Sequence, residues 1–364
     1  MSTRNSFRPG ELWPDNSGVH INVHGGGVLF HDGVYYWFGE HKIAGEAGNA
    51  AHVGVHVYSS RDLYNWRDEG IALAVSDDPH SPITRGCILE RPKVIFNPRT
   101  KKFVMWFHLE PKGNGYSDSL SGVAVADKVT GPFQFLRALR PNAGVWPLNV
   151  PDADKRELSA AELARLSDMD VAGAPRPWYP KQLLFRRDFA GGQMARDLTL
   201  FVDNDGSAYH IYASEGNGTL HISQLTDDFL QPAGKFIRVL PGRFNEAPAM
   251  LKHGGKYFLL TSDCTGWAPN AARLLAADSI FGQWEELGNP CIGPGEQIAN
   301  TFESQSTFVL PVQGKRDAYI FMADRWREQN AIDGRYVWLP IEFQHGVPTI
   351  SWRAEWDLSV FDKR

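Results

Sequence analysis

Cysteine is scarce in this chain, and its pattern suggests neither a disulfide framework nor a metal site. The 364 residues include only three cysteines, Cys87, Cys264 and Cys291. Their odd number and wide spacing match no zinc-binding or redox motif. We therefore expect these cysteines to be small core residues.

An excess of charge of one sign is also missing. Lys and Arg number 37 against 42 Asp and Glu, which gives a formal net charge of −5. Proteins that bind nucleic acid carry a basic face, and polybasic membrane anchors carry clustered Lys and Arg. We expect no nucleic-acid partner, and this charge balance favours a neutral, carbohydrate-like small molecule as the partner.

Long apolar runs, targeting signals and common catalytic strings are missing as well. No run approaches the ~20 apolar residues of a membrane span, and residues 1–10 lack the apolar core of a signal peptide. HExxH, GxGxxG, GxSxG and the P-loop string do not occur. We expect a soluble protein with no membrane partner and no cofactor. Its location is cytoplasmic as the chain stands, or secreted or periplasmic if a leader has been removed.

An internal repeat organises the residues that are present. A polar residue, a short apolar strand, a tight turn and an aromatic-rich strand recur in five copies, which begin at His24, Glu90, Asp197, Glu246 and Gln305. Their turns (HDG, NPRT, DNDG, HGG and VQGK) are hairpin signals. A second strand pair follows each copy, so each repeat contains four strands. The pattern predicts an all-β, five-bladed β-propeller, with residues 1–364 forming a single catalytic domain. A pair of β-sandwiches is the alternative.

One stretch departs from the strand pattern. Residues 154–168, DKRELSAAELARLSD, contain helix formers, and Ser159 and Glu162 have the spacing of a capping box. The stretch lies between the second and third repeats. We therefore expect a short helical insertion at the rim, between blades two and three.

The propeller predicts where polar side chains meet. The first strand of each blade lines the central axis, so the polar residues that begin the five repeats should converge on one funnel. Unpaired buried charge is costly, and three of these residues are carboxylic acids: Glu90, Asp197 and Glu246. Three acids at one axis indicate a function, although they could also only cap strand ends through salt bridges.

Carboxylates around a pocket suit glycoside hydrolysis, in which a protonated acid donates to the leaving oxygen and a second group activates water. Glu246 precedes an apolar Ala-Pro-Ala-Met stretch, which should raise its pKa and keep it protonated as the general acid. Asp197 follows Arg196, whose charge should keep it ionised. Asp197 is therefore predicted to orient the acid and to raise its pKa further.

These motifs resemble glycoside hydrolase family 43, inverting enzymes on a five-bladed propeller. The likeness rests on the five-blade plan, on Arg196–Asp197 before LTLF, and on the Glu-Ala-Pro of blade four. The strings HGGGVLF, YYWFGE, ERPKV, EAPAM, TSDCTGW and SQSTFVLP more narrowly resemble the exo-β-1,3-galactanase branch. The resemblance implies an exo-acting, inverting hydrolase that releases galactose from β-1,3-galactan. An α-L-arabinofuranosidase or other family 43 activity on an arabinose-containing glycan, and a non-catalytic sugar-binding propeller, are the alternatives.

The family pattern also implies a base Asp on blade one, where this chain has His24 followed by three glycines. The galactanase branch is similar in lacking that Asp, and the resemblance implies that Gln305 on blade five replaces it. An amide is a very poor base unless it acts as its imidic tautomer. Glu90 is the competing base, although its neighbour Arg91 favours a role in binding sugar hydroxyls.

The resemblance further implies which residues bind the terminal sugar. Besides His24, they are Glu40, Tyr116, Asn217, Thr265 and Trp267. Trp267 could stack on the apolar face of galactose, or it could pack between blades. His24 is expected to form hydrogen bonds rather than to bind a metal. Three further tryptophans are expected to pack blades near the closure of the ring: Trp338, Trp352 and Trp356.

Overall fold

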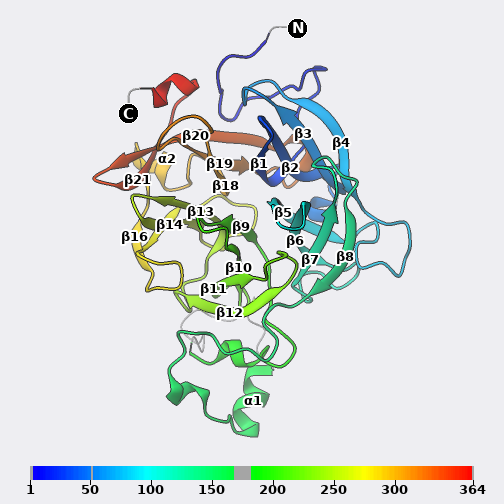
Figure 1. Ribbon diagram of the computed structural model, residues 1–364, viewed down its shortest axis with the longest axis vertical. Coiled ribbons are helices and arrows are strands. Elements are labelled where there is room, and N and C mark those ends of the chain that lie inside the picture. The colour runs from blue at the N-terminus through cyan, green and yellow to red at the C-terminus, as the bar shows by residue number, and fades with distance from the viewer. Residues whose placement is uncertain (1–2, 51, 168–181, 363–364) are drawn as a thin grey trace.

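The computed structural model describes residues 3–50, 52–167 and 182–362, and in these ranges the chain forms five β-sheets around a central axis (Figure 1). Blade one contains β1 (His24–His31), β2 (Val34–Lys42), β3 (His52–Ser60) and β4 (Arg67–Ala74). Blade two contains β5 (Ile88–Asn97), β6 (Lys102–Glu110), β7 (Leu120–Ala126) and β8 (Gln134–Leu139). Blade three contains β9 (Leu198–Val202), β10 (Ala208–Ser214), β11 (Thr219–Leu225) and β12 (Pro232–Val239).

Blade four contains β13 (Glu246–His253), β14 (Lys256–Ser262), β15 (Arg273–Ala277) and β16 (Glu285–Gly288). Blade five contains β18 (Gln305–Pro311), β19 (Tyr319–Arg325), β20 (Arg335–Gln344) and β21 (Val347–Ser351), and β17 (Cys291–Ile292) adds a short parallel strand at its outer edge. Neighbouring strands within each blade are otherwise antiparallel and follow chain order. The predicted five-bladed propeller is confirmed.

The inner strands β1, β5, β9, β13 and β18 contact one another around the axis. Their hairpin turns have the predicted chemistry. Asp32 and Gly33 between β1 and β2 both have positive φ, 48° and 78°, and Gly254 and Gly255 between β13 and β14 have φ of 57° and 83°. Two successive left-handed residues make a type I′ turn, which matches the twist of a β-hairpin.

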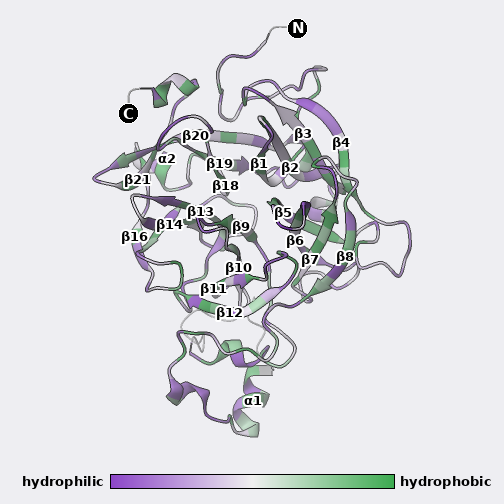
Figure 2. Cartoon of the chain, in the orientation of Figure 1, coloured by the Kyte–Doolittle hydropathy of each residue, from purple (hydrophilic) through white to green (hydrophobic). Residues whose placement is uncertain are grey.

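Apolar layers between neighbouring blades form the core. Between blades one and two, for example, Phe38 and Val55 pack with Met105 and Leu109. Figure 2 shows hydrophobic stretches within the blades and hydrophilic stretches on outer strands such as β4. Cys87 and Cys291 are buried, as expected, and Cys264 is half-buried.

The layer between blades one and five is rich in aromatic side chains. It contains Trp338 and Trp356 together with Trp13, Trp37 and Trp66 from the start of the chain. Trp352 packs instead against the layer between blades four and five. Both ends of the chain lie on this side of the ring (Figure 1), and the layer between blades one and five holds the first and last blades together. The expectation for Trp338 and Trp356 is therefore met at the closure of the ring, whereas Trp352 packs one layer away.

The predicted helix is present as α1 (Ala160–Ser167), which projects from the rim beside blade three (Figure 1). Its capping box forms, because the Ser159 amide donates to Glu162 Oε2 (2.9 Å) and the Glu162 amide donates to Ser159 Oγ (3.3 Å). Residue 168, the last of the predicted insertion, lies outside the described residues.

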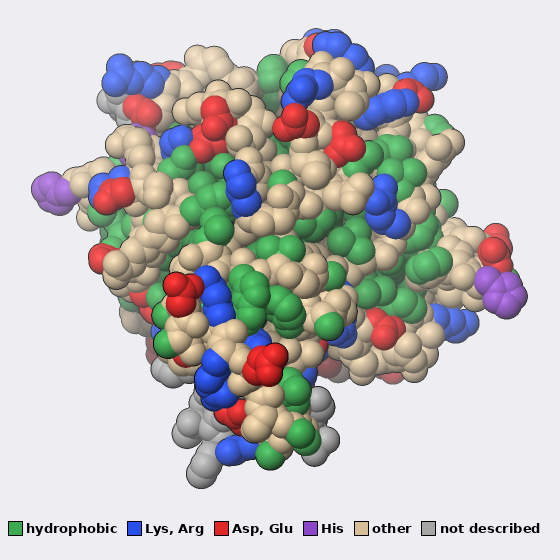
Figure 3. All heavy atoms as spheres, turned by 60° about the horizontal axis from the view of Figure 1, so that its bottom comes forward, with side chains coloured by type: hydrophobic (Ala, Val, Ile, Leu, Met, Phe, Trp, Pro, Cys, Tyr) green, Lys and Arg blue, Asp and Glu red, His purple; other side chains and the backbone are tan. Residues whose placement is uncertain are grey.

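The other helical segments within residues 3–50, 52–167 and 182–362 are short. They are α2 (Gly295–Ile298) and the 3-10 turns Gly48–Ala50, Asp152–Lys155, Leu184–Arg186, Ala331–Asp333 and Leu358–Phe361. Among the described residues, no helix is long and apolar enough to cross a membrane. Figure 3 shows acidic and basic side chains interspersed on the face it presents.

Candidate active site

The starts of the inner strands open into a cavity of about 390 Å³. All but two of the predicted site residues line it: Glu40, Glu90, Tyr116, Asn217, Asp197, Glu246, Trp267 and Gln305. Further side chains on its wall that were not among the predicted site residues include Asn49, Arg91, His108 and Trp326. Arg196 and Gly266 complete the lining.

In three blades, the backbone bends directly after the polar residue that begins the inner strand. The residue directly after His24, Glu90 and Glu246 has positive φ: Gly25 at 63°, Arg91 at 54° and Ala247 at 53°. At each of these places the pairing of the inner strand with its neighbour skips a step, as at a β-bulge. Bulges re-aim side chains near functional sites, and here they occur where the inner strand meets the cavity.

His24 and Thr265 lie outside the cavity lining. The His24 ring is fully buried and stacks on Tyr336 with ring centroids 5.3 Å apart. Its cross-strand partner Glu40 reaches the cavity in its place. The Thr265 hydroxyl donates to the carbonyl oxygen of Ala268 (2.6 Å), so it serves the loop that carries Trp267.

Glu246 has the surroundings of a general acid. Burial raises its pKa to about 8, and the negative charge of Asp197 acts in the same direction. The Asn217 amide donates to Glu246 Oε1 (2.6 Å). The backbone N–H of Ala247 donates to Asp197 Oδ2 (3.1 Å), which ties Asp197 to the strand that carries the acid.

The cation beside Asp197 is Arg91 and not the expected Arg196. Arg91 Nη2 lies 2.9 Å from Asp197 Oδ2. The Arg196 guanidinium instead donates to Ser119 Oγ (3.1 Å) and to the carbonyl oxygen of Tyr116 (2.7 Å). Sequence adjacency therefore misled the prediction, since the side chain of Arg91 extends from the kink on blade two to Asp197 on the neighbouring blade three.

Gln305 is held at three points. Its Oε1 accepts from Arg91 Nη2 (2.6 Å) and from Trp326 Nε1 (2.9 Å), and its Nε2 donates to Ser262 Oγ (2.9 Å). A guanidinium and an indole can only donate, so the atom they contact must be the amide oxygen. The orientation of the amide is therefore fixed by its neighbours.

Glu90 pairs with His108 rather than with Arg91. His108 Nδ1 lies 2.9 Å from Glu90 Oε2, and the Tyr116 hydroxyl donates to Glu90 Oε1 (2.7 Å). Burial alone would raise the pKa of Glu90, but the hydrogen bond and charge of His108 outweigh it and bring the pKa to about 2. Glu90 is therefore a weak base whose two oxygens both have donors.

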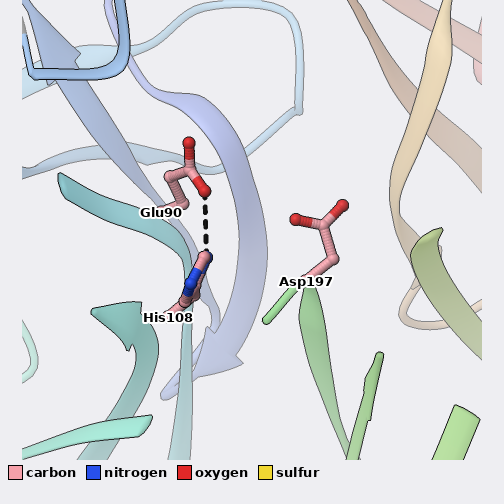
Figure 4. Close-up of side chains that lie close together, drawn as sticks. All are labelled: Glu90, His108 and Asp197. Carbon is pink, nitrogen blue, oxygen red and sulfur yellow. Dashed lines mark hydrogen bonds and ion pairs between the residues drawn. The ribbon is translucent and has the colours of Figure 1, made fainter. Parts of the chain in front are cut away.

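Glu90, His108 and Asp197 form a compact group whose ligand atoms all lie within 4.8 Å of one another (Figure 4). The donor set does not fit a metal ion. A histidine binds a metal through an unprotonated ring nitrogen, whereas both ring nitrogens of His108 face carboxylates, Glu90 and Glu110, at 2.9 Å. The Arg91 guanidinium beside Asp197 also places a positive charge at this group, which opposes the binding of a metal cation.

Two sequence patterns mark further polar side chains near the axis. The second strand of every blade has an acid within two residues of its end: Glu40, Glu110, Glu215, Asp263 and Asp324. Asp324 Oδ2 accepts from the Gly25 amide (2.7 Å), and burial raises the pKa of Asp324 to about 7. His108 lies opposite Glu90 in the strand pair, so cross-strand pairing would have placed it at the site.

Comparison with known proteins gives the family. The model of glycosyl hydrolases family 43 matches residues 169–341. A solved family 43 β-1,3-galactosidase with galactodeoxynojirimycin is 48% identical, with a TM-score of 0.90, and the alignment covers 97% of this chain and all of that one. The chain belongs to glycoside hydrolase family 43.

Other members of the family are also similar to this chain. The exo-β-1,3-galactanase of Clostridium thermocellum is 31% identical, with a TM-score of 0.76, over 97% of this chain and 66% of that one. The exo-β-1,3-galactanase of Phanerochaete chrysosporium with β-1,3-galactotriose is 29% identical, with a TM-score of 0.77, over 98% and 68%. A curated β-D-galactofuranosidase of Aspergillus niger matches at 25% identity, and that match spans 40% of this chain and 41% of the relative.

Proposed function

We propose that this family 43 hydrolase is exo-acting and releases galactose from the ends of β-1,3-galactan chains, and that residues 1–364 form one catalytic propeller. The observation that carries the proposal is the pair of Glu246 and Asp197 at the axial cavity, with the pKa of Glu246 raised to about 8. The solved relatives support the choice of sugar, since one is named a β-1,3-galactosidase and two are named exo-β-1,3-galactanases.

The proposed mechanism is a single displacement. Glu246 donates its proton to the leaving oxygen, while Asp197 orients Glu246 and raises its pKa. Family 43 is an inverting family, so water attacks the anomeric carbon from the face opposite the leaving group while the glycosidic C–O bond breaks. The proton that this water loses passes to the solvent. Gln305 positions that water, and Glu90 accepts hydrogen bonds from sugar hydroxyls, because a carboxylate with a pKa of about 2 is a poor base.

Two alternatives compete with this proposal. An arabinofuranosidase or another family 43 activity would use the same acid on a different sugar. A non-catalytic sugar-binding propeller would have no need for an acid whose pKa is raised by burial and by a neighbouring carboxylate. Neither alternative is favoured by the relatives named β-1,3-galactosidase and exo-β-1,3-galactanase.

Product analysis tests the proposal. We expect galactose as the first product from β-1,3-galactan, with little release from arabinan or from nitrophenyl arabinofuranoside. Proton NMR at early times should show the inverted anomer. A retained anomer would require a covalent nucleophile, and release of arabinose alone would overturn the choice of sugar.

A matched variant tests the acid. Glu246→Gln should lower hydrolysis of an unactivated substrate by at least ~10²-fold, because no proton is available for the leaving oxygen. Binding of the substrate should change little. Unchanged turnover would remove Glu246 from the mechanism.

A further inference from the structure

A closed circuit of hydrogen bonds surrounds Glu90. His108 lies between Glu90 and Glu110, with Nδ1 2.9 Å from Glu90 Oε2 and Nε2 2.9 Å from Glu110 Oε1. Glu110 Oε2 accepts from the backbone N–H groups of Asp118 (2.9 Å) and Ser119 (2.8 Å). The same loop carries Tyr116, whose hydroxyl returns to Glu90 Oε1 (2.7 Å).

This geometry determines how many protons His108 carries. A neutral imidazole has one N–H and one lone pair, so it could donate to only one of the two carboxylates and would present its lone pair to the other. His108 and Glu110 are almost completely buried, so water cannot replace a missing donor. With both carboxyl groups ionised, the two contacts are satisfied together only by the imidazolium.

The charges around His108 agree with this assignment. Burial alone would lower the pKa of His108, but its hydrogen bonds to Glu110 and Glu90 outweigh burial and raise the pKa to about 9. The other ionisable groups that face it are Tyr116, whose ring centroid lies 5.8 Å away, and Asp197 in the same cluster. Lys42 and Arg91 are further cations whose charges interact with Glu90.

We propose that His108 is a positioning residue that holds Glu90 ionised and oriented to accept hydroxyl groups of the terminal sugar, so that the enzyme loses sugar affinity when His108 loses its second proton. The inference rests on the proposed function. His108 itself acts through Glu90. Its single remaining proton then stays on Nε2, because the Glu110 carboxylate is completely buried and water cannot replace its donor, whereas the Glu90 side chain is 10% exposed at the cavity. Glu90 therefore loses its donor and faces the lone pair of Nδ1.

Two substitutions separate positioning from general support of the fold. In His108→Gln, the amide nitrogen lies near the former place of Nε2, so Glu110 keeps a donor and Glu90 loses one. In Glu110→Gln, the amide oxygen can still accept the two backbone N–H groups, and the amide nitrogen can donate to Nε2 of a neutral His108. That neutral His108 then keeps its Nδ1–H for Glu90 at every pH.

The test measures binding of β-1,3-galactobiose by calorimetry between pH 6 and 10, in a Glu246→Gln background that keeps the disaccharide intact and removes titration of the acid. The parent is the Glu246→Gln variant without further change. We expect its affinity for the disaccharide to fall at least about 10-fold between pH 8 and 10, because one charge-assisted hydrogen bond is lost. His108→Gln should bind at least about 10-fold more weakly already at pH 7. Glu110→Gln should bind at pH 7 within about 3-fold of the parent, and its affinity should stay nearly constant to pH 10.

His210→Gln is the matched control. His210 is also fully buried, and among the described residues neither of its ring nitrogens has a hydrogen-bond partner. It lies on β10 against Trp106 and Tyr212, outside the cavity lining. We expect its affinity and pH profile to follow the parent, so a general effect of replacing a buried histidine would be recognised.

Two outcomes would overturn the inference: parent-like affinity of His108→Gln at pH 7, or an alkaline loss in Glu110→Gln that parallels the parent. Failure of the proposed function would look different. In that case the parent itself would not bind β-1,3-galactobiose, and the wild-type enzyme would not release galactose from galactan.

Discussion

At the residue scale, the cavity separates two glutamates by their surroundings. Glu246 is buried near the negative charge of Asp197, which raises its pKa to about 8, whereas Glu90 faces an imidazolium and a hydroxyl donor, which bring its pKa to about 2. One carboxyl group is therefore protonated at neutral pH and the other is ionised. The same side-chain chemistry supplies a proton donor and a hydroxyl acceptor in one cavity.

The pH profile should report Glu246. Because only its protonated form donates, kcat/KM on β-1,3-galactobiose should fall as the pH rises through about 8. In Asp197→Asn the neighbouring negative charge is lost, so the pKa of Glu246 falls and the alkaline limb moves to lower pH. An alkaline limb that stays in place, or moves upward, would show that Asp197 does not act on the acid.

A substrate with an activated leaving group tests whether Gln305 or Glu90 acts on the attacking water. On dinitrophenyl galactoside, which needs little acid catalysis, Glu246→Gln should recover part of its activity. Gln305→Ala should remain at least ~10²-fold impaired, because water must be positioned whatever group departs. We expect Glu90→Gln to lose activity without rescue by azide, as suits a sugar-binding residue. Azide rescue of Glu90→Gln, together with near-normal turnover of Gln305→Ala, would make Glu90 the base.

At the scale of single elements, the inner strand and its kink do most of the positioning. The repeat predicted the five polar positions at the axis, since hairpin turns and strand alternation are local signals that fix where each inner strand starts. It could not predict that Arg91 would pair with Asp197 or that Glu40 would replace His24 at the cavity. Both depend on left-handed residues after the axial position and on side chains that cross between strands or blades.

Gly26 on β1 allows close packing of this strand against β2, and a substitution there tests how tight that packing is. A Cβ on Gly26 would lie 1.7 Å from the carbonyl oxygen of Phe38 on β2. Gly26→Ala should therefore lower the free energy of unfolding by about 1–3 kcal/mol or more, through forced displacement of the strand pair. Gly295→Ala is the control, because a Cβ there meets no atom within 4 Å. Urea unfolding curves measure both, and equal stability of the two variants would contradict the steric argument.

At the scale of the whole molecule, closure of the ring depends on contacts between the two ends of the chain. In the described residues, blades one and five are separate sheets that share no strand. Phe7 and Trp356, from opposite ends of the chain, exchange two backbone hydrogen bonds of 2.7 and 3.1 Å, and their rings stack with centroids 4.3 Å apart. The Trp356 indole also donates to the carbonyl oxygen of Trp338 (2.8 Å). These contacts hold the ends of the chain together and seal the layer between the first and last blades.

Trp356→Ala should therefore destabilise the whole propeller, by about 3–5 kcal/mol, because it opens a large gap in that layer and removes the partner of Phe7. Phe7→Ala should cost less after Trp356 has been replaced than before, since the two rings share one contact. Urea unfolding of the two single variants and the double variant measures this coupling. Trp267→Ala is the control from the cavity wall: it should leave the unfolding midpoint nearly unchanged and weaken sugar binding. If Trp356→Ala were no less stable than Trp267→Ala, the ring would have to be closed by the other contacts between blades one and five, such as those of β1 with β18 and β19.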